Sequence, residues 1–123
     1  MRFSEADTGG GHRIEGYEPG RILIDGKSYR SGLILTPERI VDGWGPADPA
    51  QLSEDHVAEL VDLAPQVIVI GTGGRQVFPA PAVYAGAMRR GVGVEIMDTG
   101  AACRTYNILM AEGRKIVAGL IVT

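Results

Sequence analysis

The most chemically varied stretch of the chain lies where an apolar strand is expected to meet a helix. Eight side chains between residues 95 and 107 carry carboxylate, hydroxyl, thiol, guanidinium, phenol or amide groups: Glu95, Asp98, Thr99, Cys103, Arg104, Thr105, Tyr106 and Asn107. The first N–H groups of a helix have no partner inside the helix and attract anions. The stretch therefore indicates either an anion site or a tight structural corner, and the residues alone leave both interpretations open.

A glycine-rich loop follows another apolar strand in the same half of the chain. Its residues are Gly71, Thr72, Gly73, Gly74 and Arg75. Glycines after a strand let backbone N–H groups approach a phosphate or carboxylate, and Arg75 offers a bidentate contact. Neither a dinucleotide fingerprint nor a Walker A loop is present, because Gln76 stands where the third glycine is needed and no Gly-Lys-Ser/Thr follows. The loop is either a tight turn or a non-standard anion site.

Helical spacing divides the residues after position 98 between two faces. Tyr106 lies on a face suited to the core, whereas Arg104 and Asn107 stand three residues apart and share another face. In the structural interpretation, Arg104 pairs with Asp98 or Glu95, Asn107 satisfies a nearby backbone group and Tyr106 packs with its hydroxyl bonded. The functional alternative is a ligand or partner site at one sheet edge, formed by Gly71, Thr72, Gly73, Gly74, Arg75, Asp98, Thr99, Arg104, Tyr106 and Asn107.

The sequence shows no set of residues suited to covalent catalysis or to metal binding. Cys103 is the one cysteine, and a thiol nucleophile needs a neighbouring base. The two histidines, His12 and His56, fall in the N-terminal arm and in the first turn of a different helix, where His56 is expected to be solvated. Metal-ligand spacing is absent. The sequence therefore predicts no catalytic residue, no metal and no cofactor.

The secondary structure expected from the sequence differs between the two halves of the chain. The first half is β-rich, with an Asp25-Gly26 hairpin signal and Trp44 as either a packing anchor or an exposed contact. The second half alternates strands and helices, which indicates an α/β layer with a parallel pair. The expected strands are 22–24, 33–36, 39–44, 67–70, 92–97 and 116–122, and the expected helices are 53–64, 81–90 and 98–112.

Composition favours one domain, 14–123, after a flexible N-terminal arm over 1–13. A hydrophobic fraction of 45% can fill a core, and a net charge of −3 argues against a nucleic-acid binder. Residues 1–62 hold 6 Lys/Arg and 12 Asp/Glu, whereas residues 63–123 hold 6 and 3, so the halves differ in sign. Either the halves compensate each other, or the second half presents a basic face to an acidic ligand or protein. No signal peptide or membrane span is recognised, so a cytoplasmic protein is expected.

Linked motifs across the chain resemble the Mth-type domain family. They are Val69-Ile70-Gly71-Thr72-Gly73, Pro79, Gly93-Val94-Glu95-Ile96-Met97-Asp98-Thr99, Ala102-Cys103-Arg104-Thr105-Tyr106-Asn107-Ile108-Leu109 and Glu112-Gly113-Arg114. The resemblance covers roughly residues 14–122. The family includes small bacterial and archaeal proteins of unknown function, the adipogenesis-associated Mth-domain protein and the mitochondrial complex I assembly factor three.

This resemblance implies an α/β, three-layer fold with a central mixed β-sheet, flanking helices and an added N-terminal β-rich, hammerhead-like piece. It carries over no catalytic residue. The mitochondrial relative implies a non-catalytic binding or assembly module with a protein partner, such as a membrane-complex subunit. The alternative is a small anionic-ligand-binding protein or unrecognised enzyme, with a site between the Gly71–Gly74 loop and the Thr99 helix start. We expect no nucleic acid, no direct membrane insertion, and a monomer or weak homo-oligomer.

Overall fold

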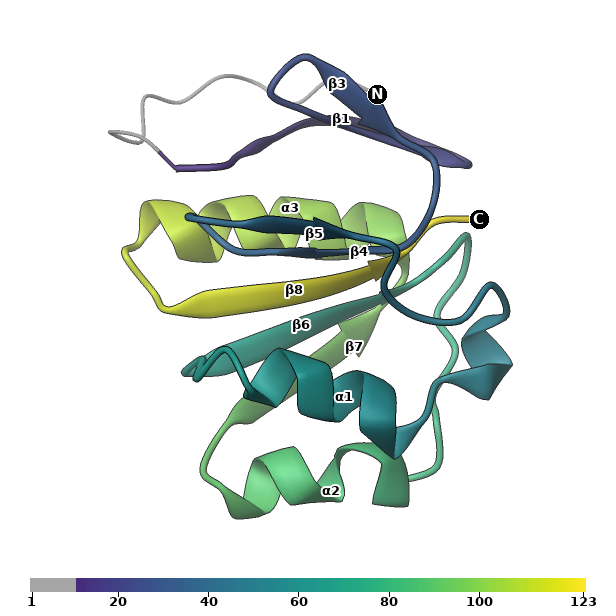
Figure 1. Ribbon diagram of the computed structural model, residues 1–123, viewed down its shortest axis with the longest axis vertical. Helices are drawn as coiled ribbons and strands as arrows, with labels where there is room; N and C mark the ends of the chain where they lie inside the picture. The colour runs from purple at the N-terminus through teal and green to yellow at the C-terminus, as the bar shows by residue number, and fades with distance from the viewer. Residues whose placement is uncertain (1–10) are drawn as a thin grey trace.

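A five-stranded mixed sheet forms the centre of the computed structural model, which describes residues 11–123 (Figure 1). Its strand order is β5-β4-β8-β6-β7. β6 pairs in parallel with both of its neighbours, so that Val69 lies opposite Glu95 on one side and Ala118 on the other. β4 runs antiparallel to β8 and β5. The five strands are β4 (Leu33–Leu35), β5 (Ile40–Asp42), β6 (Val67–Thr72), β7 (Gly93–Met97) and β8 (Ile116–Ile121).

The N-terminal strands form a separate three-stranded antiparallel sheet. It contains β1 (Ile14–Glu18), β2 (Arg21–Ile24) and β3 (Lys27–Tyr29), in that order. The turn between β2 and β3 is the predicted hairpin: Asp25 and Gly26 have φ values of 52° and 77°. Positive φ at both central residues is what a two-residue turn matched to strand twist requires.

Within residues 11–123, three α-helices cover the two faces of the central sheet. α1 (Glu54–Val61) and α2 (Ala82–Arg89) lie on one face, and α3 (Thr99–Ala111) lies on the other face, between the two sheets (Figure 1). A short 3₁₀ helix, Pro49–Gln51, precedes α1. The predicted mixed α/β fold with an added N-terminal β piece is therefore confirmed, and that piece is the small sheet over α3.

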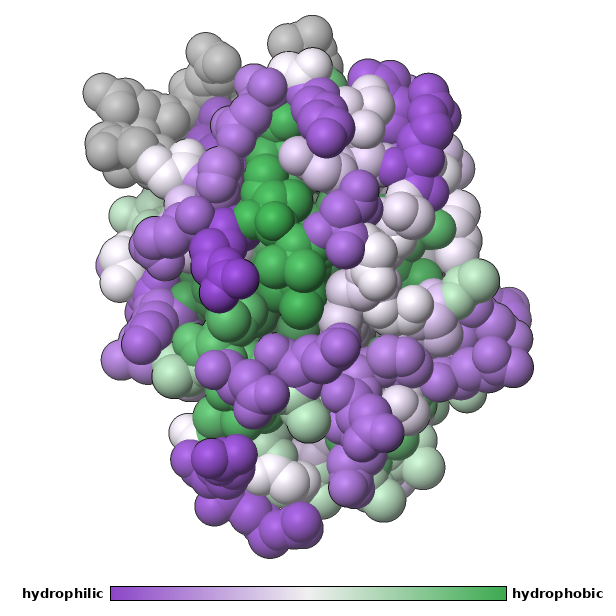
Figure 2. Space-filling view, in the orientation of Figure 1, coloured by the Kyte–Doolittle hydropathy of each residue, from purple (hydrophilic) through white to green (hydrophobic). Residues whose placement is uncertain are grey.

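The sheet divides the core into two clusters because side chains alternate along a strand. Val67 and Val69 face α3 and the small sheet, whereas Ile68 and Ile70 face α1 and α2. Tyr106 is among the largest fully buried side chains. The space-filling view shows an apolar band where the small sheet meets the central sheet near β5 (Figure 2), and Ile40 of β5 is only partly buried there.

The structure decides between the two interpretations of Trp44, which lies beside α1, and it corrects the expectation for His56, which lies in the first turn of α1. Trp44 is a packing anchor, 3% exposed, and its indole N–H donates to the His56 carbonyl oxygen at 3.0 Å. His56 was expected to be solvated, but its Nδ1 accepts the N–H of Ser53 at 2.9 Å and completes a capping box. The histidine therefore takes the place that Glu or Gln usually has in this motif.

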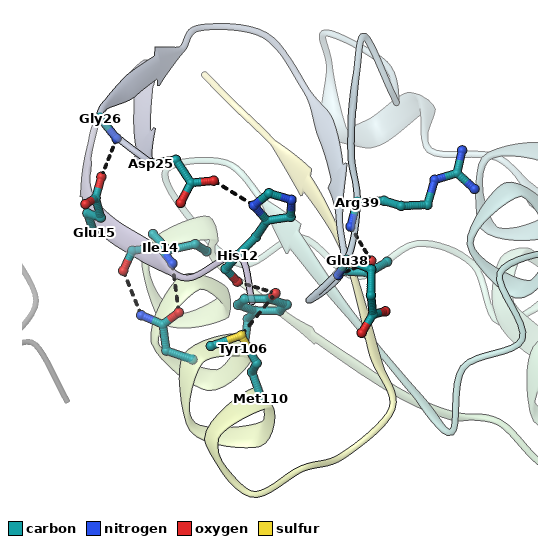
Figure 3. A network of polar contacts seen from close by, with 11 residues as sticks. His12, Ile14, Glu15, Asp25, Gly26, Glu38, Arg39, Tyr106 and Met110 are labelled. Carbon is teal, nitrogen blue, oxygen red and sulfur yellow. Dashed lines mark hydrogen bonds and ion pairs between the residues drawn. The ribbon is translucent and has the colours of Figure 1, made fainter. Parts of the chain in front are cut away.

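The segment leading into β1 is attached to the rest of the fold. Residues 1–10 of the expected flexible arm lie outside the described residues. His12 donates its N–H to the carbonyl oxygen of Pro37 at 2.8 Å, and its ring Nδ1 lies 2.6 Å from a carboxylate oxygen of Asp25 (Figure 3). These contacts fix the start of β1 against the β2–β3 turn and the β4–β5 connection.

Candidate functional site

One threonine joins the glycine loop, the start of α3 and the last strand. Thr99 donates its N–H to the Gly73 carbonyl oxygen at 2.9 Å, and its Oγ1 accepts the N–H of Gly73 at 2.7 Å. The same hydroxyl donates to the carbonyl oxygen of Ile121 at 2.6 Å. Thr99 is fully buried, and these three bonds satisfy its N–H and its hydroxyl in the absence of solvent. We call residues 71–75 and 95–107 together the polar corner.

The first glycine of the loop is needed for packing. A Cβ added at Gly71 would lie 2.8 Å from Thr99 Oγ1 and 2.9 Å from the Cα of Thr99. These distances are too short for any side chain, so glycine lets α3 approach β6. Gly74, by contrast, is exposed and would meet nothing within 4 Å.

The hydroxyl of Thr72 shapes the loop that follows. It accepts the N–H of Val77 at 3.0 Å and lies 2.7 Å from the Arg75 carbonyl oxygen and 3.2 Å from that of Met97. Thr72 is 2% exposed. Its side chain thus closes a turn over residues 72–77 and joins it to the end of β7.

The N-terminus of α3 is occupied by the chain's own side chains. Asp98 is the N-cap, and its Oδ1 accepts the N–H of Ala101 at 2.8 Å. Gly100 is buried against β1, where an added Cβ would lie 3.2 Å from the ring of Tyr17. A carboxylate cap and an aromatic ring therefore cover the positions at which an anion would approach the helix start.

Tyr106 and Asn107 hold the small sheet onto α3. The Tyr106 hydroxyl donates to the His12 carbonyl oxygen at 2.6 Å (Figure 3). Burial raises the pKa of Tyr106, and the carboxylates of Glu38 and Asp25 add to the rise. Asn107 accepts the N–H of Ile14 at 3.0 Å and donates to the Ile14 carbonyl oxygen at 2.8 Å. Its amide makes the pair of bonds that a neighbouring strand would make to β1.

The two arginines among the predicted site residues lie apart from these contacts. Both side chains are exposed. The ion pairs within residues 11–123 join His12 to Asp25 and Arg21 to Glu18, so Arg104 pairs with neither Asp98 nor Glu95. Arg75 lines a half-open hollow of about 600 Å³ with Thr72 and Gly74 on one side and residues 47–50 on the other. Thr99, Arg104 and Asn107 do not line this hollow.

Cys103 is placed as a core residue. It is fully buried, and burial raises the pKa of its thiol to about 12, with Arg104 opposing and Asp98 adding to the rise. The thiol is therefore protonated at neutral pH, whereas a nucleophile needs the thiolate. Among residues 11–123, no three His, Cys, Asp or Glu side chains gather as a metal site would require.

A family model described as "Protein of unknown function (DUF498/DUF598)" matches residues 14–121. The chain belongs to the DUF498 family. Its solved relatives include a Bordetella parapertussis protein, 36% identical with a TM-score of 0.87 over 93% of this chain and 98% of that one. A Bordetella pertussis protein described as a Mth938-like domain is 30% identical with a TM-score of 0.78, over 98% and 90% of the two chains. The resemblance to the Mth-type family is thereby confirmed.

Two curated relatives of this DUF498 chain carry names that mention membranes or assembly. A "13 kDa major membrane protein" of Francisella tularensis is 29% identical over 101 residues, 81% of this chain and 82% of that protein. The human "NADH dehydrogenase [ubiquinone] 1 alpha subcomplex assembly factor 3" is 32% identical over 110 residues, 88% of this chain. The match spans only 59% of that human protein. Within the part described here, no helix has the length and hydrophobicity to cross a membrane.

The sequence interpretation singled out no residue of the segment 76–90 as a site. The structure places two large apolar side chains at its surface, Phe78 (69% exposed) and Met88 (56% exposed). A signal was present in the sequence, because no Asp or Glu occurs between Asp62 and Glu95 although this segment includes a surface helix.

Proposed function

We propose that this DUF498 protein is a non-catalytic binding module that assists the assembly of a larger complex through a protein partner. Its similarity to a complex I assembly factor supports this proposal. The observation that carries it is the state of the polar corner: Thr99, Tyr106 and Asn107 direct their polar atoms to backbone groups of the fold. Side chains committed in this way position elements and are not available to a substrate. The proposal places the module in the cytoplasm.

The partner is tested by tagging the full chain at its own locus and isolating it at its natural level. We expect the same partner to be enriched over an untagged strain in repeated isolations. Recovery of no specific protein would contradict the proposal. Analysis of membrane complexes on native gels after deletion of the gene would show whether an assembly intermediate accumulates.

The non-catalytic part of the proposal is tested by complementation of that deletion. Cys103→Ala removes the one thiol, and Arg104→Ala removes an exposed cation of the corner. Both variants are expected to restore assembly as the unchanged chain does. A folded variant that binds the partner but fails to restore assembly would point to chemistry at that residue.

The hollow beside Arg75 favours a second candidate function, the binding of a small anion. Its guanidinium makes no ion pair within residues 11–123 and lies beyond the carboxyl end of β6, where α/β sheets often bind ligands. An anionic metabolite at 100 times its dissociation constant would stabilise the fold by about 2.7 kcal/mol. A thermal-shift screen should then find a ligand whose effect Arg75→Ala removes. If Arg104→Ala removes it instead, the site lies at the start of α3, and a screen without any shift would end this candidate.

A further inference from the structure

Helix α2 lacks the polar outer side that a surface helix normally has. Its eight residues, Ala82–Arg89, include one charged side chain. Ala87 is buried and Val83 packs into the core cluster under α1 and α2. The opposite side carries Ala82, Ala85, Met88 and Arg89, and Met88 is 56% exposed. A helix that is apolar on nearly every side is usually covered.

Neighbouring α1 shows that this sheet face does not require an apolar outer side. α1 also has eight residues and also buries one stripe, with Val57 and Leu60. Its outer side carries the exposed carboxylates of Glu54, Asp55 and Glu59. Both helices pack against the same core cluster, so packing against the sheet does not explain why the outer side of α2 lacks the carboxylates that α1 has.

The loop before α2 carries a second exposed apolar side chain. Phe78, 69% exposed, lies in it, and α2 is the outermost element at one end of the long axis (Figure 1). A crease of about 170 Å³ separates α1 from α2, and neither Phe78 nor Met88 lines it. The two side chains therefore project from the molecule. We call Phe78 together with the outer side of α2 (Ala82, Ala85, Met88 and Arg89) the α2 surface.

The charged side chains at the end of α2 are cations. Arg89 and Arg90 are exposed and form no ion pair within residues 11–123. The carboxylate nearest to them in the crease between the helices belongs to Glu54 of α1, which lines that crease with both arginines. Carboxylates are absent from residues 63–94. A second copy paired across a two-fold axis would bring these arginines toward their own counterparts, which disfavours a homodimer through this surface. The complementary occupant is anionic.

We propose that the α2 surface rests on an anionic phospholipid membrane. Phe78 and Met88 would enter the headgroup region while the arginines meet lipid phosphates, as in interfacial helices with an apolar side and flanking cations. A lipid surface fits this combination, because exposed apolar side chains suit the acyl boundary and the guanidinium of Arg89 suits the phosphates. The carboxylates of α1 keep that helix away from the lipid, so the molecule docks by its α2 end. This inference goes beyond the proposed function and does not depend on a protein partner.

Flotation of the full chain with vesicles tests the proposal. We expect binding to phosphatidylcholine vesicles that contain phosphatidylglycerol, weaker binding at high salt, and no binding to phosphatidylcholine alone. Replacing both Arg89 and Arg90 by Gln should lower the partition coefficient about 25-fold, since one arginine near an anionic surface contributes a factor of about five. Met88→Ser and Phe78→Ser should each lower it about tenfold through lost apolar burial.

Matched variants elsewhere on the surface control for charge and hydrophobicity. Ile108→Ser removes an apolar side chain of α3 that is 59% exposed, and replacing Arg114 and Lys115 by Gln removes two exposed cations after α3. Both controls should bind within about twofold of the unchanged chain. Absence of binding to anionic vesicles, or equal losses in the control variants, would overturn the proposal.

The partner experiment separates this inference from the proposed function. If Met88→Ser loses the protein partner while the unchanged chain ignores vesicles, the α2 surface is a protein interface, and the lipid proposal is wrong while the proposed function stands. If vesicle binding behaves as expected and no partner is recovered, the lipid proposal stands and the proposed function fails.

Discussion

The polar corner and the α2 surface are opposites in chemistry and in availability. The corner holds nearly every kind of polar side chain, yet Thr99, Asp98, Tyr106 and Asn107 all bond to backbone groups. The α2 surface has few polar groups, yet its large side chains are left uncovered. The difference teaches that density of functional groups is a poor guide to a site. A better guide is whether a side chain has polar atoms without a hydrogen-bond partner or apolar surface exposed to solvent.

Thr99→Val should have the largest effect and would break the corner. Valine keeps the shape but leaves the Gly73 N–H and the Ile121 carbonyl without the bonds that the hydroxyl supplies. Each buried unsatisfied group costs about 1–3 kcal/mol, so the loss of both bonds should lower the free energy of unfolding by about 2–6 kcal/mol in urea titration. Thr105→Val is the matched control, because within residues 11–123 its hydroxyl meets only the sulfur of Met97. Equal stability of the two variants would show that the corner does not hold the fold.

The glycine loop offers a second comparison within the corner. Gly71→Ala forces a methyl group against Thr99 and should cost about 1–3 kcal/mol through overpacking. Gly74→Ala has open space around it and should leave the unfolding midpoint nearly unchanged or slightly raised. If Gly74→Ala proved the more damaging, the loop would have a role other than packing.

The thiol of Cys103 should make stability fall at alkaline pH. Its pKa is about 12 in the folded state against an ordinary value of 9.0, so the unfolded chain loses this proton at lower pH. Stability from this group is therefore complete below pH 9 and declines as pH rises toward 12, by up to about 1.4 kcal/mol per pH unit. Urea titrations across that range should show a shallower decline for Cys103→Ala. Tyr106, whose pKa is also raised, maintains part of the decline in both proteins.

The smallest effect is expected where the α2 surface is altered. Phe78→Ser and Met88→Ser remove exposed side chains and should change the free energy of unfolding by less than about 0.5 kcal/mol. Leu60→Ala on the buried side of α1 should cost about 2–5 kcal/mol in the same assay. A large loss from Met88→Ser would mean that α2 needs this side chain for folding, and would remove the contrast with the corner.

The features that are local in sequence could be predicted. The Asp25-Gly26 turn, the start of a helix at residue 53 and the alternation of strands and helices follow from turn chemistry and periodicity. A bonded Tyr106 hydroxyl and a backbone partner for Asn107 are part of the structural interpretation of the sequence. The partners themselves, His12 and Ile14, could not be predicted, because they lie more than ninety residues away. Helical spacing placed Asn107 on a shared face with Arg104, but one lies against β1 and the other is exposed.

The exposure of the α2 surface also could not be predicted from local sequence. The lack of carboxylates around α2 is visible in the sequence. The exposure of α2, however, depends on the strand order: β8 lies between β4 and β6, so β7 and the neighbouring α2 lie at the end of the sheet. Strand order of this kind is set by long-range pairing. An apolar helix in the sequence therefore suggests a buried one until the sheet topology is known.

Hydrogen exchange of the full chain, with and without vesicles containing phosphatidylglycerol, tests the contrast between the two regions most directly. The account predicts slower exchange in peptides covering residues 75–90 when vesicles are present, and no change over 95–107, where the amides are already protected by the fold. Slower exchange over 95–107 with residues 75–90 unaffected would contradict it, because the corner would then be the contact surface.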